Sequence, residues 1–146
     1  MNKKIIIGAG IIVLIFLAII VKPRNNATNN VNSFGATKIQ VFLFHATQRC
    51  STCIRIGRLT QATIEERFAE ELKSEKIEFR EINIDLPENK ALVEKFQAGG
   101  SALYINAIKN GQDNIAEDTT VWQLAPGYEI KFKDYLANKL NTILGM

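Results

Sequence analysis

The chain has 146 residues, of which 47% are hydrophobic and 23% are charged. This composition excludes a disordered chain, and the length allows one compact domain plus appendages. The net charge of +3 arises from Lys3, Lys4, Lys22 and Arg24, since the rest of the chain carries 14 basic and 15 acidic residues. Bulk charge therefore gives no case for nucleic-acid binding.

The first segment, residues 1–24, is organised around an apolar run. Ile5–Val21 contains 17 uncharged residues, close to the shortest length that spans a bilayer and longer than the roughly 7–15 residues of a signal-peptide core. The residues before Lys22 contain no A-x-A-like cleavage site. We therefore predict an uncleaved, single-pass transmembrane anchor. The alternatives are a cleaved signal peptide and a buried core helix.

The location of the remaining chain follows from either membrane interpretation. A signal peptide carries the following domain out of the cytoplasm, and so does an anchor whose N-terminus stays inside. We expect a cell-membrane protein with its domain on the extracytoplasmic side, periplasmic or extracellular, with a secreted protein as the alternative. Residues 25–36 are rich in Asn and lack periodicity, which predicts a flexible linker between the anchor and a domain over residues 37–146.

That domain opens with a strand–helix–strand unit. The strand Ile39–His45 is almost continuously apolar, as expected for a strand buried on both faces. Apolar spacing from Thr52 to about Lys76 predicts one long helix, and the alternating Ile77–Ile84 predicts a second strand. Such a unit has parallel strands and a right-handed crossover. The acidic run Glu65–Glu81 is interpreted as a solvated face.

The sequence of the second half of the domain predicts a helix, a hairpin and two further helices. Asn110-Gly111 is the signature of a two-residue hairpin turn, so the strands on either side of it should be antiparallel. The sequence thus predicts an α/β domain with a central mixed four-stranded sheet flanked by helices. The elements expected after the second strand are a helix from Glu88 to about Gln97, a strand Ala102–Ile108, a strand from about Gln112 to Ala116, a short helix Thr119–Leu124 capped by Asp118, and a helix from about Tyr128 to Leu144.

The two cysteines of the chain, Cys50 and Cys53, form a C-x-x-C at the junction of the first strand and the first helix. This arrangement is typical of a thiol–disulfide site. A helix N-terminus and the adjacent Arg49 both favour a thiolate at Cys50. We therefore predict that Cys50 attacks and Cys53 resolves, through a redox-active disulfide and with no other cofactor. The alternative is a soft-metal site, although no second ligand pair in the sequence completes a zinc centre.

Other candidate site residues surround the cysteines. His45, the single histidine, ends the first strand five residues before Cys50, where it could exchange a proton with a cysteine. Arg49, Arg55 and Arg58 lie close together, and no acidic residue occurs between Met1 and Ile64. A basic rim of this kind favours an acidic partner surface or an anionic substrate. The alternative is ordinary solvated helix charge.

The order of these elements resembles the thioredoxin-like superfamily over about Thr37–Gly145. More narrowly, the stretch Phe44–Cys53 resembles the FHGTxRCxTC signature of the nitrophenyl compound nitroreductase subunit ArsF family. This resemblance implies a thioredoxin-like electron or thiol carrier that acts beside a membrane permease or reductase for aromatic nitro or arsenical compounds. The signature residues that the chain shares are His45, Thr47, Arg49, Cys50, Thr52 and Cys53, which places His45, Arg49 and Thr52 in supporting roles.

Two departures from the superfamily pattern bear on function. The dipeptide between the cysteines is Ser51-Thr52, whereas typical thioredoxins have Gly-Pro. Typical members also carry a cis-proline before the third strand, and here that place holds Gly99-Gly100-Ser101. By position Gly100 and Ser101, with Arg55 and Arg58, are expected to bind the partner. The missing proline strengthens the metal alternative and weakens general protein-disulfide reduction.

We therefore predict a membrane-tethered, thioredoxin-like thiol–disulfide oxidoreductase or electron carrier that serves a specific protein partner. Two alternatives remain open. One is a C-x-x-C carrier of a metal or metalloid. The other is a non-catalytic accessory subunit that uses the same fold as a docking platform.

Overall fold

The structure, a computed structural model, describes residues 35–146. The predicted anchor Ile5–Val21 and most of the predicted linker lie outside the described residues. Within residues 35–146, every helix is too short or too polar to cross a membrane.

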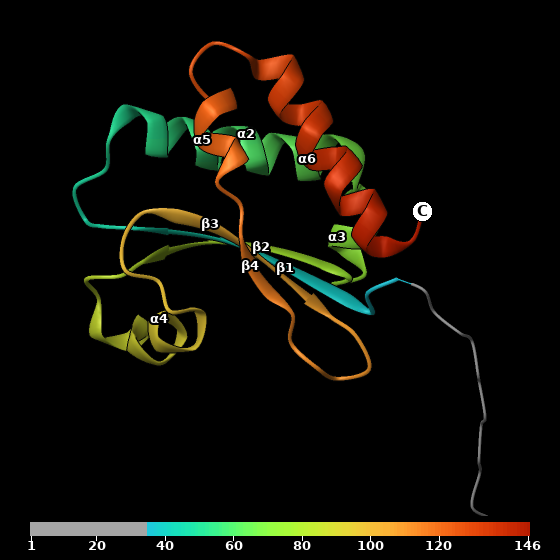
Figure 1. Ribbon diagram of the computed structural model, residues 1–146, viewed down its shortest axis with the longest axis horizontal. Coiled ribbons are helices and arrows are strands. Elements are labelled where there is room, and N and C mark those ends of the chain that lie inside the picture. Colours follow the sequence, from blue (N-terminus) through green and yellow to red (C-terminus); the bar gives the residue numbers. More distant parts are fainter. Residues whose placement is uncertain (1–34) are drawn as a thin grey trace, which may run out of the picture. The chain divides into compact units, whose positions relative to one another are not determined.

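The described residues build a four-stranded sheet in the order β2-β1-β3-β4 (Figure 1). Strands β1 and β2 are parallel, whereas β3 is antiparallel to both β1 and β4. The mixed sheet is therefore the one expected. The elements, in chain order, are β1 (Lys38–His45), α2 (Ser51–Arg67), α3 (Ala69–Lys73), β2 (Ile77–Asn83), the 3-10 turn η1 (Pro87–Asn89), α4 (Lys90–Phe96), β3 (Ala102–Ile108), β4 (Ile115–Glu117), α5 (Thr120–Leu124) and α6 (Glu129–Leu144).

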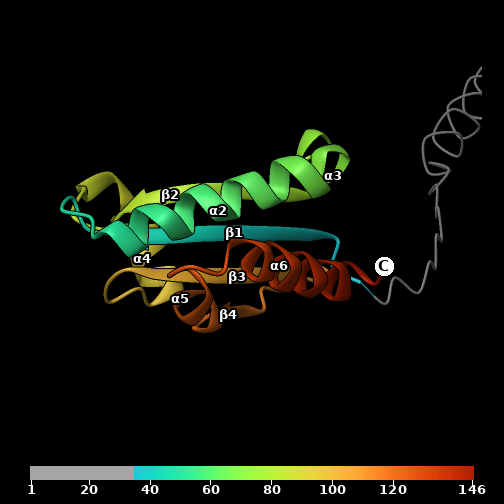
Figure 2. The ribbon, with the colours of Figure 1, turned by 90° about the horizontal axis from the view of Figure 1, so that it is seen from above.

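Helices cover both faces of the sheet. In Figure 1, α2, α5 and α6 lie on one face and α4 lies on the other. Figure 2 shows α2 and α6 running side by side along the strands. The central strand β1 accordingly divides its side chains between two cores: Val41 and Leu43 pack beneath α2 and α6, and Phe42 and Phe44 pack with Phe96 of α4. The continuous apolar run of β1 thus follows from burial on both faces.

The long helix predicted over residues 52–76 is wrong in one respect, because it breaks at Phe68. The backbone of Phe68 leaves the helical region, at φ −137° and ψ 35°, and separates α2 from α3. The break lets the Phe68 ring enter the core, where it is 2% exposed. No Gly or Pro marks this position, and the apolar spacing of Ile64, Phe68 and Leu72 continues through it. Local pattern alone therefore gives no sign of the break.

The predicted hairpin turn is confirmed, but the fourth strand begins later than expected. Asn110 and Gly111 have φ values of 52° and 77°, as a turn of this kind requires at both central residues. The strand was expected from Gln112, whereas β4 begins at Ile115. The buried side chain of Asn106 causes the delay, because it donates to Asp113 Oδ1 over 2.6 Å and accepts from the Asn114 amide over 2.9 Å. The helix expected from Glu88 is likewise observed as η1 followed by α4.

Candidate functional site

The C-x-x-C lies at the start of α2, after the loop that follows β1. Cys50 is the N-cap of α2, and its sulfur accepts a hydrogen bond from the Cys53 amide over 3.1 Å. A disulfide joins the two residues, whose Cα atoms are 5.1 Å apart. Cys50 is exposed, whereas Cys53 is only 3% exposed. Cys50 is therefore the member of the pair that is accessible from solvent, and Cys53 is the buried one.

Arg49 is held at the site by an acid from the neighbouring strand. Its Nη1 lies 2.5 Å from Glu81 Oε2, and its Nη2 donates to the Cys53 carbonyl over 3.4 Å. Strand pairing places Glu81 beside Leu43 of β1. Glu81 is exposed, as expected for a residue of the acidic run, but its carboxylate is also paired with Arg49, which the sequence interpretation did not anticipate.

Gly57 of α2 makes room for this ion pair. Gly57 is buried, and a Cβ atom built on it would lie 1.9 Å from Glu81 Oε1 and 3.1 Å from Arg49 Nη2. A glycine inside a helix costs about 1 kcal/mol relative to alanine. The absence of a side chain at this position is therefore what allows the carboxylate to lie against the helix that carries the cysteines.

The other two arginines near the site are also paired. Arg58 donates to Glu129 Oε2 over 3.3 Å, and Arg55 Nη2 lies 3.9 Å from the same oxygen. The hydrogen bond from Arg58 holds the pKa of Glu129 below its usual value, so this carboxylate is ionised at neutral pH. The rim is therefore less basic than the local sequence indicates, because tertiary contacts bring an acid to each arginine.

A shallow groove of about 420 Å³ lies directly beside the cysteines. Ile54, next to Cys53, is 52% exposed at this groove. Exposed apolar surface beside a reactive group is suited to contact with a partner protein. The groove also includes Thr52 and both predicted partner-binding arginines, and its lining residues are Ser51, Thr52, Ile54, Arg55, Arg58 and Pro126.

The loop between β1 and the cysteines is tied to the end of β2. The Thr47 amide donates to Asp85 Oδ2 over 2.7 Å, and Asn83 Nδ2 donates to Thr47 Oγ1 over 3.0 Å. The bond from the Thr47 amide lowers the pKa of the Asp85 carboxyl group. Sequence reasoning missed both Asn83 and Asp85, although their place at the end of the strand neighbouring β1 was an available signal.

His45 and the pair Gly100-Ser101 lie at the same end of the sheet as the cysteines. The ring Nδ1 of His45 is 2.9 Å from the carbonyl oxygen of Ala46, so the described hydrogen bond of this ring is with the loop backbone. Ala102 pairs with Phe44 across β3 and β1, which brings the preceding Gly100 and Ser101 to this edge. No cis peptide bond occurs within residues 35–146.

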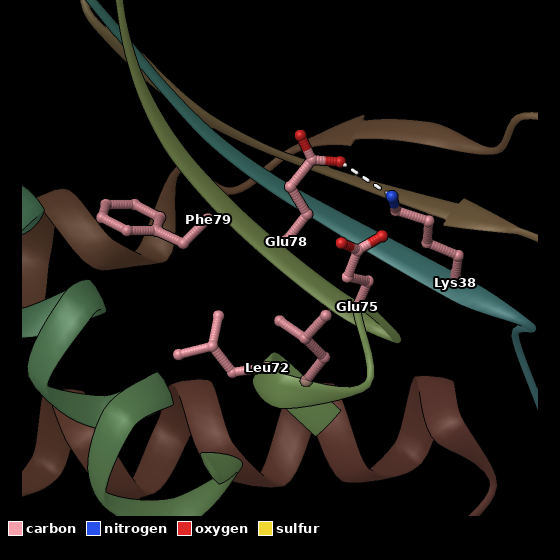
Figure 3. Close-up of a pocket in the computed structure, with 6 residues that line it drawn as sticks. Lys38, Leu72, Glu75, Glu78 and Phe79 are labelled. Atoms are coloured by element: carbon pink, nitrogen blue, oxygen red, sulfur yellow. Dashed lines mark ion pairs between the residues drawn. The ribbon is translucent and has the colours of Figure 1, made fainter. Parts of the chain in front are cut away.

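A second cavity, of about 320 Å³, lies at the opposite end of β1 (Figure 3). Lys38 Nζ and Glu78 Oε2 form an ion pair of 3.1 Å at this cavity. Leu72 and Phe79 supply an apolar side, as Figure 3 shows. Across the described part of the chain, no group of three or more His, Cys, Asp or Glu side chains is arranged to hold a metal ion.

The strand order, the parallel pair joined through α2, and the β3–β4 hairpin followed by α6 define a thioredoxin-like α/β fold. No protein-family model matches the chain, and no curated protein is similar to it in sequence. This fold and the Cys50–Cys53 pair fit a thiol–disulfide oxidoreductase.

Solved structures with some likeness to the chain include two thioredoxins. That of Fasciola hepatica is 17% identical, with 73% of this chain and 82% of that one covered at a TM-score of 0.44. That of Thermus thermophilus is 11% identical, with 71% and 75% covered at a TM-score of 0.41. A malarial protein is 16% identical, with 56% and 81% covered at a TM-score of 0.38. These likenesses are distant, so the fold class rests on the chain's own topology.

Proposed function

We propose that this chain is a membrane-tethered thiol–disulfide oxidoreductase that carries electrons through Cys50 and Cys53 to or from a specific protein partner. The observation that carries the proposal is the asymmetry of the pair, with an exposed Cys50 at a helix N-cap and a Cys53 that is 3% exposed. The helix N-terminus stabilises a thiolate on the accessible sulfur. The buried sulfur is then the one that resolves an intermolecular bond.

The proposed exchange proceeds in two balanced steps. A thiolate of a reduced partner attacks Cys50 Sγ, and the electron pair of the Cys50–Cys53 bond leaves on Cys53 Sγ. A second partner thiolate then attacks the partner's sulfur in the mixed disulfide, and that bond's electron pair leaves on Cys50 Sγ. The partner becomes a disulfide and the C-x-x-C gains two electrons, with protons exchanged with solvent. The reverse sequence passes the electrons on.

The membrane tether and the nature of the partner are further parts of the proposal. The apolar run Ile5–Val21 supports a single-pass anchor with the domain on the extracytoplasmic side. The Phe44–Cys53 stretch, with its resemblance to the nitrophenyl compound nitroreductase subunit ArsF family, supports a partner that is a membrane permease or reductase for aromatic nitro or arsenical compounds. The exposed Ile54 and the groove beside it are suited to contact with that partner.

A redox titration of the full chain in detergent tests the proposal. Thiols are counted by the mass added on alkylation across glutathione and dithiothreitol buffers, and metal content is measured on the same samples. We expect one two-electron couple within the span of about −120 to −270 mV known for thiol oxidoreductases. A pair that forms no internal disulfide, or does so only after metal is stripped, would instead support the metal-carrier alternative.

Variants of the two cysteines separate catalysis from docking. Cys53→Ser should trap a mixed disulfide at Cys50 with the partner in cells, because the resolving sulfur is gone. Cys50→Ser should abolish both the trapped species and the cellular function. Normal function in the Cys50→Ser strain would support the accessory-subunit alternative.

A further inference from the structure

We propose that Glu81 sets the redox poise of the Cys50–Cys53 pair by holding and neutralising the guanidinium of Arg49. This inference rests on the proposed function and adds a positioning residue to it. Glu81 belongs to β2, and the ion pair joins residues that are 32 positions apart in the sequence. The pair is therefore a product of the tertiary structure rather than of the C-x-x-C motif.

The ion pair between Arg49 and Glu81 lies against α2, the helix that carries the cysteines. Arg49 directly precedes the N-cap Cys50, and its guanidinium bridges Glu81 and the carbonyl of Cys53. The other carboxylate oxygen of Glu81 occupies the space beside Gly57. Cys53 and Gly57 are four residues apart in α2, so they share one face of the helix. The carboxylate thus lies about one helical turn from the buried cysteine.

A purely stabilising role does not account for this arrangement. The side chains of Arg49 and Glu81 remain 21% and 33% exposed, and ion pairs with such access to water contribute little to stability. The helix meanwhile holds a glycine at position 57, and glycine is unfavourable inside a helix. Arg49 Nε is also buried without a hydrogen-bond partner. Stability alone therefore gives little reason for this arrangement, which favours a role in the chemistry of the site.

The sign of the effect follows from charge. A positive Arg49 beside the helix N-terminus favours the thiolate of the reduced pair, and the negative Glu81 opposes that effect. Stabilising the thiolate stabilises the reduced state and makes the pair a stronger oxidant. Removing the Glu81 charge should therefore make the pair more oxidising, and removing the Arg49 charge should make it more reducing.

Charge-neutral variants of the full chain test this directly. Relative to wild type, Glu81→Gln should raise the equilibrium constant for reduction by glutathione about three- to tenfold, the scale expected for one nearby charge; tenfold corresponds to about 30 mV. It should also lower the pH at which Cys50 alkylation reaches half its maximum rate. Arg49→Gln should shift both readouts in the opposite direction.

The matched control is the ion pair at the far end of the same strand. Glu78 of β2 pairs with Lys38 over 3.1 Å (Figure 3), and Glu78→Gln should leave both readouts at their wild-type values. A Glu81→Gln protein with wild-type readouts would overturn the inference. So would equal shifts in the Glu78→Gln protein, or shifts of the same sign in the Glu81→Gln and Arg49→Gln proteins.

Gly57→Ala tests the same relationship without changing any charge. The added Cβ displaces the Glu81 carboxylate, so the variant should shift both readouts in the direction of Glu81→Gln. The double variant Gly57→Ala/Glu81→Gln should match Glu81→Gln alone, because both changes act through one carboxylate. Additive shifts would count against the inference.

The proposed function and this inference fail in different ways. A wild-type Cys50–Cys53 pair that does not cycle between disulfide and dithiol would refute the proposed function. A pair that cycles but does not respond to the Glu81 substitution would refute only this inference.

Discussion

Asp118 Oδ2 accepts a hydrogen bond from Lys139 Nζ over 2.8 Å, at a point where the Asp118 side chain is 1% exposed. The same carboxylate accepts bonds from the Tyr135 hydroxyl over 3.0 Å and from the Thr120 amide over 3.0 Å. Asp118 was predicted to cap a helix starting at Thr119, but the N-cap of α5 is Thr119 and the helix starts at Thr120. The Asp118 carboxylate instead ties the amide of Thr120, at the start of α5, to two positions on α6.

Asp118→Ala should therefore be strongly destabilising. It leaves three donors at a buried site without their acceptor, and we expect a loss of about 2–4 kcal/mol in the free energy of unfolding. The control is Asp134→Ala, which removes the exposed pair with Arg67 and should cost less than about 1 kcal/mol. Urea denaturation measures both values. Equal losses in the two variants would contradict this assignment.

The same cluster predicts a dependence of stability on alkaline pH. Burial opposes the charge on Lys139, but the hydrogen bond and charge of Asp118 outweigh it, so the pKa of Lys139 is raised. A raised pKa in the folded state adds stability that is complete below the unfolded value of about 10.4 and is lost as pH rises through the folded value. Urea denaturation from pH 9 to 12 should thus show a steeper loss for wild type than for Lys139→Gln. Parallel curves would refute the coupling.

The amide of Thr47, in the loop before the cysteines, should lose its hydrogen bond to Asp85 in acid. The bond from the Thr47 amide lowers the pKa of Asp85, so this bond is complete above the ordinary Asp value of about 3.9 and is lost as pH falls through the lower folded value. The NMR shift of the Thr47 amide should follow that titration from pH 2 to 6, and Asp85→Asn should abolish it. In Asp113→Asn, a change at a carboxylate bonded to Asn106, the Thr47 titration should persist.

Gly35 should resist substitution because of the backbone that faces it. A Cβ atom on Gly35 would lie 1.8 Å from the carbonyl oxygen of Leu144, near the end of α6. We expect Gly35→Ala to lower the free energy of unfolding by about 1–3 kcal/mol, as overpacking does. Gly99→Ala is the control, since nothing lies within 4 Å of its added atom, and its effect should stay within about 0.5 kcal/mol.

Burial of the Phe68 ring at the helix break should contribute a large part of the free energy of unfolding. Phe68→Ala empties a position that is 2% exposed, and we expect a loss of about 3–5 kcal/mol in the free energy of unfolding. Leu72→Ala, one turn later at a side chain that is 36% exposed, should cost much less. If the two variants lost similar free energies, the core role of Phe68 would be mistaken.

Several features of this protein were decided by short stretches of sequence. The apolar run of β1 required burial on both faces, and the bounds of β3, Ala102–Ile108, match those expected. Asn110-Gly111 determined its turn because both residues tolerate positive φ. The spacing of Cys50 and Cys53 after a strand placed the sulfurs at a helix start. Each of these depends on backbone preferences and periodicities that act over a few residues.

Only the tertiary structure decided which charges meet at the site. Arg49 and Glu81 are 32 residues apart, and Arg58 and Glu129 are 71 residues apart. Their contacts depend on the register of β1 with β2 and on the packing of α2 against α6, which no local pattern encodes. The break at Phe68 also depends on the tertiary structure. Burial of the Phe68 ring in the core interrupts the helix there, although the helical spacing of apolar residues continues past it. The sequence therefore determined where the sulfurs are, and the fold determined the charges that surround them.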